Sequence, residues 1–241
     1  MKIEVLFPEI CNLYGDLANI KVIKESIDNV EIIETHLTDT PYFINNKVDM
    51  IYMGTMTENS QILVINKLRE YTENIKRSID SGINFFITGN AIEVFGNTIS
   101  EDNEHVIDGL GIIDIDSNRD SRNRYNSLYV GDFNTVDETI KVVGFKSVFG
   151  FTQGKSLDNK LFHTRLGYAS NLNTKNEGVW INNFMATYVI GPLFVLNPPF
   201  AEWYFKNMLG VDAKPAYYDA AMDAYNARLE EYLTPGKGWK Y

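Results

Sequence analysis

The sequence has little of what would tie it to a membrane or to disulfide chemistry. Its 241 residues include one cysteine, so an intramolecular disulfide is excluded. The longest apolar run covers residues 184–196, shorter than the roughly 20 residues that span a bilayer. The N-terminus carries Glu4 and Glu9, and Pro8 interrupts its apolar stretch, which is not the pattern of a secretion signal. We therefore expect a soluble, cytoplasmic protein with no membrane insertion.

Positive charge and histidine are also scarce. Lys and Arg total 22 against 32 Asp and Glu, which gives a net charge of −10 spread along the chain. Such a chain repels phosphate backbones, so we expect no nucleic-acid partner. The three histidines, His36, His105 and His163, show no metal-ligand spacing, and no cysteine accompanies them. We therefore expect neither a metal site nor a cofactor, and each histidine is interpreted as structural or exposed.

The first ninety residues alternate between strand and helix patterns. Helical periodicity is clearest over 58–80, with Thr57 as the expected N-cap and Gly82 as the stop. Four apolar strands are expected at 2–7, 30–37, 48–54 and 83–89, and a second helix at 16–28. Strands separated by helices at this spacing predict an α/β fold, with a parallel sheet covered on both faces.

The middle of the chain changes to shorter strands separated by polar turns. We expect these strands at 110–115, 127–133, 140–152, 161–168 and 179–190, and a charged loop at 117–126. Two helices, 199–209 and 217–233, close the chain. No linker is evident, so we predict one domain, 1–241, in which 211–241 is a C-terminal helical extension. A ligand of such a sheet lies beyond the carboxyl ends of its strands, which here are 7–12, 54–58, 89–91 and 190–192.

Six segments, mostly near those strand ends, carry a family resemblance. They are FPEICNLYGDLANI (7–20), MGTMTENSQ (53–61), GNAIEVFG (89–96), VGFKSVFGFT (143–152), NEGVW (176–180) and ATYVIGPLFVLNP (186–198). In this order they resemble class I glutamine amidotransferase-like proteins of the cobyric acid synthase type, in particular the glutaminase subunits of lipid II isoglutaminyl synthases. The resemblance implies a flavodoxin-like fold with a mostly parallel central sheet and an added antiparallel portion. It also implies a Mur-ligase-like or other ATP-dependent amidating subunit as partner, in cell-wall precursor or cobalamin-type amidation.

The positions that carry chemistry in that family are occupied differently here. Anchoring the family elbow on Gly96 places Gly89 at the nucleophilic cysteine, and sliding it by one residue places Thr88 there. The family's histidine falls on Ile190, and its glycine-rich turn falls on 54–56, where only the first glycine remains. A glycine cannot attack an amide, and an isoleucine cannot transfer a proton. We therefore expect glutaminase activity to be absent.

Two hypotheses of different kinds follow. The first is a degenerate family member that supports or regulates a ligase-like partner, with no catalytic residue of its own. The second is an enzyme or small-molecule binder that reuses the pocket around Thr88, Asn90 and Glu93 without a cysteine nucleophile. An active glutaminase with unusual residues ranks last. The pocket candidates are Gly54, Glu58, Asn90, Glu93 and Arg124.

Several of these residues also have plainer interpretations. Glu58 can offset the positive end of a helix dipole, and Glu93 can be helix-start charge. Arg124, which the resemblance associates with a substrate carboxylate, can belong to a solvated loop with its neighbouring arginines. Cys11 is interpreted mainly as a small buried apolar residue. The apolar stripe of 217–233 can pack on its own sheet or against a partner.

Overall fold

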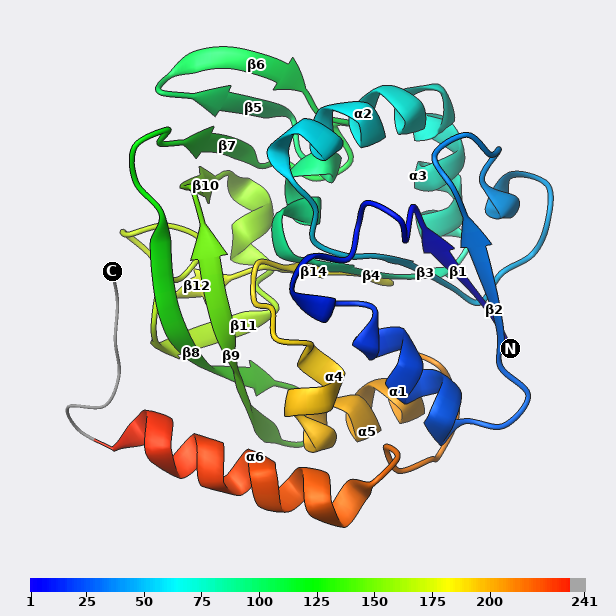
Figure 1. The fold of residues 1–241 in the computed structure, drawn as a ribbon, viewed down its shortest axis with the longest axis vertical. Coiled ribbons are helices and arrows are strands. Elements are labelled where there is room, and N and C mark those ends of the chain that lie inside the picture. Colours follow the sequence, from blue (N-terminus) through cyan, green and yellow to red (C-terminus); the bar gives the residue numbers. More distant parts are fainter. Residues whose placement is uncertain (235–241) are drawn as a thin grey trace.

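A six-stranded sheet forms the centre of the computed structural model, which describes residues 1–234 (Figure 1). The strand order is β13-β14-β4-β3-β1-β2, and every neighbouring pair is parallel except β13 with β14. The bounds are β1 Lys2–Leu6, β2 Glu31–Thr35, β3 Met50–Met53, β4 Asn84–Thr88, β13 Val179–Ile181 and β14 Phe184–Thr187. The predicted parallel sheet is thus confirmed.

Helices cover both faces of this sheet, as Figure 1 shows. Successive strand residues alternate between two apolar clusters, with Ile51 and Phe85 in one and Met50 and Phe86 in the other. Because both faces are buried, the strands read as continuous apolar runs. On one face lie α2 Glu58–Leu68, α3 Thr72–Asp80 and the 3₁₀ helix η4 Gly89–Phe95. On the other lie α1 Ala18–Ser26, α4 Leu193–Leu196 and α5 Pro198–Asn207.

The predicted helix over 58–80 is interrupted. Thr57 does cap its start, because the Thr57 hydroxyl accepts a hydrogen bond from the Ser60 amide at 3.1 Å. The prediction of one helix is wrong at Arg69–Tyr71, where a 3₁₀ turn, η3, separates α2 from α3. The Thr72 hydroxyl donates to the Arg69 carbonyl at 2.9 Å, a local bond that competes with the helical hydrogen-bond ladder.

Two smaller sheets form the antiparallel portion, which confirms that expectation. One has the order β12-β11-β8-β9 and the other β10-β7-β5-β6, with only β5 and β7 parallel. Their strands are β5 Thr98–Glu101, β6 Glu104–Asp108, β7 Asp116–Arg119, β8 Tyr125–Asn134, β9 Thr139–Val148, β10 Gly150–Gln153, β11 Phe162–Leu166 and β12 Asn176–Glu177. Further 3₁₀ turns are η1 Leu13–Gly15, η2 Tyr42–Ile44 and η5 Lys155–Asp158.

Two predictions in this region are wrong. Residues 110–115 form bends and irregular chain rather than a strand, and the charged loop expected at 117–126 contains most of β7. Hairpin β5–β6 was not predicted at all, because its alternation of Thr, Ser and Glu with few apolar residues hides the strand period. The error at β7 matters for the site, because it misplaces Arg119.

The last described helix, α6 Tyr218–Leu233, packs back on the chain's own sheet. Tyr225 lies against Val130 and Val143 of strands β8 and β9, and its hydroxyl donates to the Lys141 carbonyl at 2.8 Å. The expected extension 211–241 is therefore helical from Tyr218, and residues 235–241 lie outside the described part.

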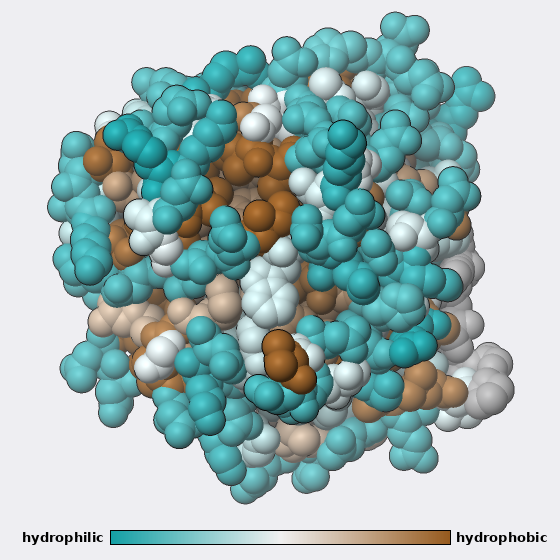
Figure 2. Space-filling model, turned by 180° about the vertical axis from the view of Figure 1, so that it is seen from behind, coloured by the Kyte–Doolittle hydropathy of each residue, from teal (hydrophilic) through white to brown (hydrophobic). Residues whose placement is uncertain are grey.

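No helix in residues 1–234 is both long and apolar enough to cross a membrane. The face opposite Figure 1 is mainly hydrophilic, with its largest group of apolar residues in one hollow and smaller apolar groups elsewhere (Figure 2).

Candidate functional site

The turn after β4 has the geometry of a strained strand-to-helix elbow. Thr88 is still extended at φ −123°, whereas Gly89 has φ +63°. In such elbows the nucleophilic residue adopts a strained conformation between a strand and a helix, and this exposes its side chain. Of the two residues that the sequence alignment left open, Gly89 therefore has the elbow conformation. An ideal Cβ at Gly89 would lie 2.8 Å from both Cβ and Cγ2 of Thr55, so Thr55 fills the space a side chain there would need.

A buried carboxylate, Asp16, collects hydrogen bonds beneath this elbow. Its Oδ2 accepts from the Thr88 hydroxyl at 2.5 Å, from the Thr55 hydroxyl at 2.9 Å and from the Thr55 amide at 3.2 Å. The Tyr52 hydroxyl donates to the Asp16 carbonyl and lies 3.0 Å from Thr88 Oγ1. Burial raises the pKa of Asp16, and the hydroxyl donors oppose that rise. The Thr88 hydroxyl is thus engaged with a carboxylate and closed off from solvent.

In the turn that follows β3, the amides of Thr55 and Met56 are both engaged in hydrogen bonds. The Thr55 amide is bound to Asp16, and the Met56 amide donates to Asn90 Oδ1 at 3.1 Å. Asn90 returns a bond from Nδ2 to the Met56 carbonyl at 2.9 Å. An ideal Cβ on Gly54 would lie 2.6 Å from the Cys11 carbonyl, so this glycine permits close approach of two chain segments.

Glu93 is the centre of a second buried network. Its Oε2 lies 3.0 Å from the Arg119 guanidinium and 3.1 Å from the Gln61 amide nitrogen, and its Oε1 accepts from the Tyr188 hydroxyl at 3.0 Å. Arg119 also donates to the Gln61 side-chain oxygen. Burial raises the pKa of Glu93, while the Arg119 charge opposes that rise. The carboxylate is thus paired and hydrogen-bonded, as a buried charge requires.

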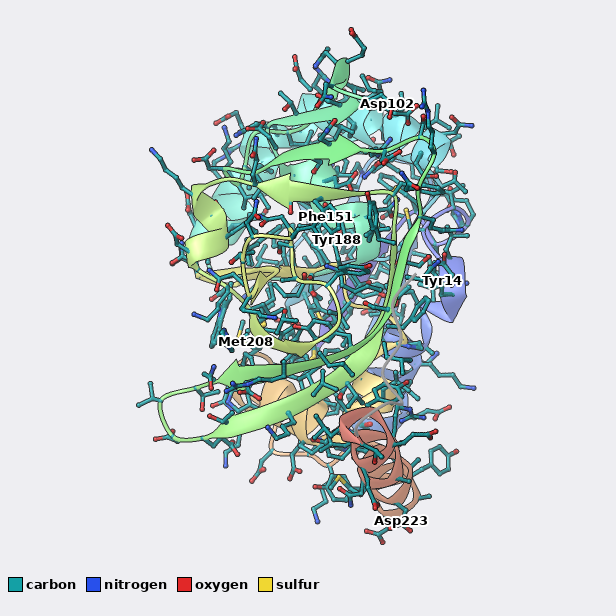
Figure 3. All side chains as sticks on the ribbon, turned by 90° about the vertical axis from the view of Figure 1, so that its left-hand side faces the viewer. Tyr14, Asp102, Phe151, Tyr188, Met208 and Asp223 are labelled. Atoms are coloured by element: carbon teal, nitrogen blue, oxygen red, sulfur yellow. The ribbon has the colours of Figure 1, made fainter. Side chains whose placement is uncertain are left out.

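A pocket of about 220 Å³ opens between these two networks, and four of the five predicted pocket residues line it. They are Glu58, Asn90, Glu93 and Arg124, whereas Gly54 does not line it and lies close to the Cys11 carbonyl. At its mouth Arg124 donates to the Tyr14 hydroxyl at 2.8 Å and stacks 4.7 Å above the Phe149 ring (Tyr14 in Figure 3). Glu58 lies in the first turn of α2 as well as in the pocket wall.

Ile190, the aligned base position, is buried and has no titratable group. Its amide and carbonyl form two 3.0 Å hydrogen bonds with the backbone of Phe145. Next to it, Lys146 and Glu177 form a fully buried ion pair at 2.7 Å, and Lys146 also donates to the Ala169 carbonyl at 2.9 Å. Lys146 belongs to the matched segment 143–152 and Glu177 to the matched segment 176–180.

The remaining candidates lie elsewhere. His36 and His105 are exposed beside Glu9 and Asp108, at 3.1 and 3.5 Å. Residues 1–234 contain no group of three or more His, Cys, Asp or Glu side chains placed to hold a metal. Cys11 is buried with its sulfur 3.9 Å from that of Met56, and burial raises the pKa of its thiol.

Sequence reasoning missed three residues that build the site. Asp16 belongs to the NLYGD motif but was not singled out, and Gln61 ends the matched segment 53–61. Arg119 was grouped with an exposed loop, although its buried partner Glu93 was a candidate. A buried carboxylate needs a cationic partner, and the sequence had named none for Glu93. That missing partner was the one signal that could have directed attention to Arg119.

Comparison with known families identifies one family for this chain. A family model described as a CobB/CobQ-like glutamine amidotransferase domain matches residues 2–197. The GatD subunit of lipid II isoglutaminyl synthase (glutamine-hydrolyzing) from Staphylococcus aureus is 24% identical over 189 residues, which cover 77% of this chain and 75% of that protein. Two solved structures from Thermotoga maritima share the fold. PurLQS has a TM-score of 0.55 at 11% identity and covers 95% of this chain and 98% of its own. A glutamine amidotransferase has a TM-score of 0.53 at 8% identity, and the match covers 94% of this chain and 92% of that protein.

Proposed function

The chain belongs to the CobB/CobQ-like glutamine amidotransferase family, and we propose that it is a member that no longer hydrolyses glutamine. In this proposal it acts as a scaffold or regulatory subunit for an ATP-dependent, ligase-like partner. Such a subunit would work in the cytoplasm and would keep the family's fold. The residues at the family's catalytic positions would then serve to pack and stabilise that fold.

One observation carries the proposal: the elbow position holds a glycine whose side-chain space is filled. Gly89 has the left-handed conformation of an elbow, but an ideal Cβ there would lie 2.8 Å from Thr55. A cysteine at this position would have no room for its thiol while Thr55 is present. Thr88, the adjacent hydroxyl, donates to buried Asp16 and is not available to attack a substrate.

The other two parts of the glutaminase machinery point the same way. Ile190 stands where the resemblance places the base, and a hydrocarbon side chain moves no proton. The amides of Thr55 and Met56 already donate to Asp16 and Asn90, so they are not aimed at a developing oxyanion. In this proposal a glycine packed against Thr55 stands at the nucleophile position and an isoleucine at the base position. The backbone amides of the turn are engaged with Asp16 and Asn90.

The partner class rests on the named relative. That relative is one subunit of a synthase, so its activity is exercised in an assembly. We propose a corresponding Mur-ligase-like or other amidating partner for this chain, in cell-wall precursor or cobalamin-type amidation.

The test has two arms. In the first, purified protein is incubated with L-glutamine and glutamate is measured, beside a triple variant, Gly89→Cys with Thr55→Gly and Ile190→His. Turnover by the natural protein above a heat-killed blank would overturn the proposal. Turnover by the triple variant alone would support it and show that the pocket still accepts glutamine. In the second arm, the protein is co-purified from its host, and an ATP-dependent ligase is the expected companion.

A second candidate function is ligand binding without hydrolysis in the 220 Å³ pocket. The observation that favours it is Arg124, a guanidinium at the pocket mouth whose fork suits a carboxylate. Thermal-shift titration with L-glutamine and L-glutamate tests it. The candidate predicts a shift that Arg124→Ala abolishes, and a midpoint unmoved by either amino acid argues against it.

A further inference from the structure

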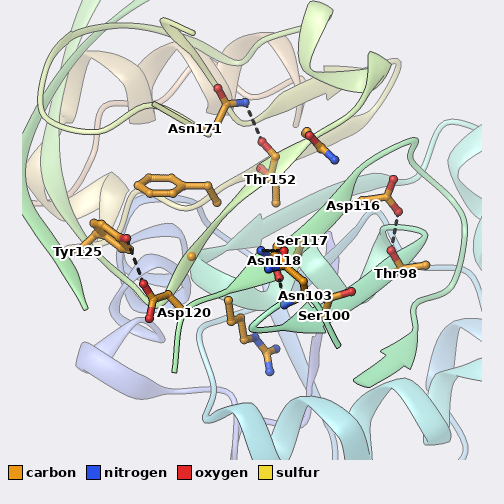
Figure 4. A pocket seen from close by; sticks show the side chains of 14 residues that line it. Thr98, Ser100, Asn103, Asp116, Ser117, Asn118, Asp120, Tyr125, Thr152 and Asn171 are labelled. Atoms are coloured by element: carbon orange, nitrogen blue, oxygen red, sulfur yellow. Dashed lines mark hydrogen bonds between the residues drawn. The ribbon is translucent and has the colours of Figure 1, made fainter. Parts of the chain in front are cut away.

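A second, larger hollow lies over the sheet β10-β7-β5-β6, on the opposite side of β7 from the buried networks (Figure 4). Its volume is about 680 Å³, within the range of small-molecule pockets. Arg119 belongs to its wall, but the Arg119 guanidinium is turned to Glu93 on the other face. The two hollows thus share Arg119 as a wall residue, but its charged group is engaged with Glu93.

The floor of this hollow is set by strand register. Residues paired across neighbouring strands project from the same face, and the next residue along each strand projects from the other. Ser117 and Arg119 are the buried residues of β7, so Asp116 and Asn118 face outward. The pairing then forms two outward cross-strand rows, Thr98–Asp116–Gln153 and Ser100–Asn118–Phe151, which we call the polar platform.

The platform has polar walls and one aromatic corner. Asn103 rises from the β5–β6 turn and accepts a 3.0 Å bond from the Asn118 amide. Asn171 stands on the opposite wall, held by a 2.8 Å bond to the Thr152 carbonyl. At the corner the Phe151 ring packs 4.6 Å from that of Tyr125 and leaves Phe151 half-buried. Figure 4 shows Asn103, Asn118, Asn171 and Tyr125 around a common space.

The charges around the platform restrict its ligand. Asp116 and Asp120 are the acidic residues of the lining, and its one basic residue, Arg119, is already paired. A phosphate or carboxylate would therefore meet repulsion without a compensating cation. Amide and hydroxyl groups predominate instead, and they both donate and accept hydrogen bonds. The Ser100 and Gln153 side chains have no hydrogen-bond partner within residues 1–234.

We propose that the polar platform binds a small neutral saccharide of about one to two sugar rings. Sugar hydroxyls match the mixed donors and acceptors of Asn118, Asp116 and Gln153. The apolar C–H face of a sugar ring suits the exposed part of Phe151. Nothing in this proposal depends on the loss of glutaminase activity.

The test is ligand-observed saturation-transfer NMR with the whole chain. The probes are maltose, cellobiose and N,N′-diacetylchitobiose, with glucose 6-phosphate as the anionic comparison. Gln153→Ala is the main variant, because Gln153 is exposed and has no internal partner, so its removal leaves the fold intact. Phe151→Ala is the second variant. Val136→Ala is the control, since Val136 is fully exposed in the turn between β8 and β9.

The expected result is millimolar or tighter binding of at least one neutral probe. Gln153→Ala and Phe151→Ala should each weaken it by about tenfold, and Val136→Ala should leave it unchanged. Absence of saturation transfer to all three neutral probes would overturn the proposal. Binding that Gln153→Ala leaves intact would also overturn it, as would stronger binding of glucose 6-phosphate.

Discussion

Replacing Gly89 by alanine tests whether the elbow is closed by Thr55. An L-residue at the observed φ of +63° costs about 1–2 kcal/mol in the left-handed region. The added methyl would also lie 2.8 Å from Thr55 Cβ and Cγ2, and overpacking of this kind costs about 1–3 kcal/mol. Gly89→Ala is therefore expected to lower the free energy of unfolding by about 2–5 kcal/mol.

Gly111 supplies a matched control. Its φ is +61°, and an ideal Cβ there would meet no atom within 4 Å. Gly111→Ala should therefore cost only the conformational part, about 1–2 kcal/mol. The difference between the two variants isolates the steric contact with Thr55. Combining Gly89→Ala with Thr55→Gly should then show a favourable coupling of about 1–3 kcal/mol in a double-mutant cycle.

The assay is urea unfolding followed by circular dichroism and tryptophan fluorescence, with equal denaturant slopes required for each comparison. If Gly89→Ala and Gly111→Ala destabilise the protein equally, Thr55 does not fill the elbow. The same conclusion follows if the cycle with Thr55→Gly shows no coupling. In either case the observation on which the proposed function rests would fail.

Three further predictions concern buried groups. Arg119→Met should lower the free energy of unfolding by about 3–5 kcal/mol, because it leaves Glu93 unpaired, and Glu93→Gln added to it should recover part of that loss in urea unfolding. Burial raises the pKa of Asp16 above its ordinary 3.8. Between that ordinary value and the folded pKa, the folded protein therefore holds a proton on Asp16 that the unfolded chain has released. The stability this proton contributes is full below about pH 4 and is lost as pH rises through the folded pKa, so the natural protein should lose stability relative to Asp16→Asn over that rise. Cys11 should resist maleimide in the native state and react fully in guanidinium, and rapid native labelling would contradict its burial.

The sequence predicted the inner strands of the central sheet well because β1, β3 and β4 are buried on both faces. Runs such as 48–54 and 83–89 contain almost no polar residue, and that pattern belongs to parallel strands between two helical layers. The helix at 58–80 was also clear, but the local bond between Thr72 and Arg69 that divides it carries no periodic signal. Boundaries and breaks of this kind depend on single side chains, which hydrophobic periodicity does not weigh.

The sequence predicted where the candidate site lies, but not which of its side chains contact one another. Alignment of the elbow and the rule for strand ends brought together Glu58, Asn90 and Glu93, and the family resemblance added Arg124. These four residues do line one pocket. The partner of Glu93 comes from β7, a strand in a sheet that the sequence did not reveal. A pair that joins residues 93 and 119 through two different elements needs the tertiary structure to be seen.

The closed contacts of the elbow also explain why a single reversion should not restore chemistry. A cysteine at position 89 requires the removal of Thr55, but Thr55 supplies two of the hydrogen bonds that Asp16 Oδ2 accepts. Removing its side chain would leave a buried carboxylate with fewer donors, at a cost of about 1–3 kcal/mol for the lost hydroxyl. Apart from the backbone amide, Thr88 would then be the remaining donor to Asp16 Oδ2, through its 2.5 Å bond, while Asn19 donates to Oδ1 at 3.3 Å. Gly89→Cys alone is therefore not expected to restore glutaminase activity, because the change at Thr55 that it requires also weakens the hydrogen bonding of Asp16.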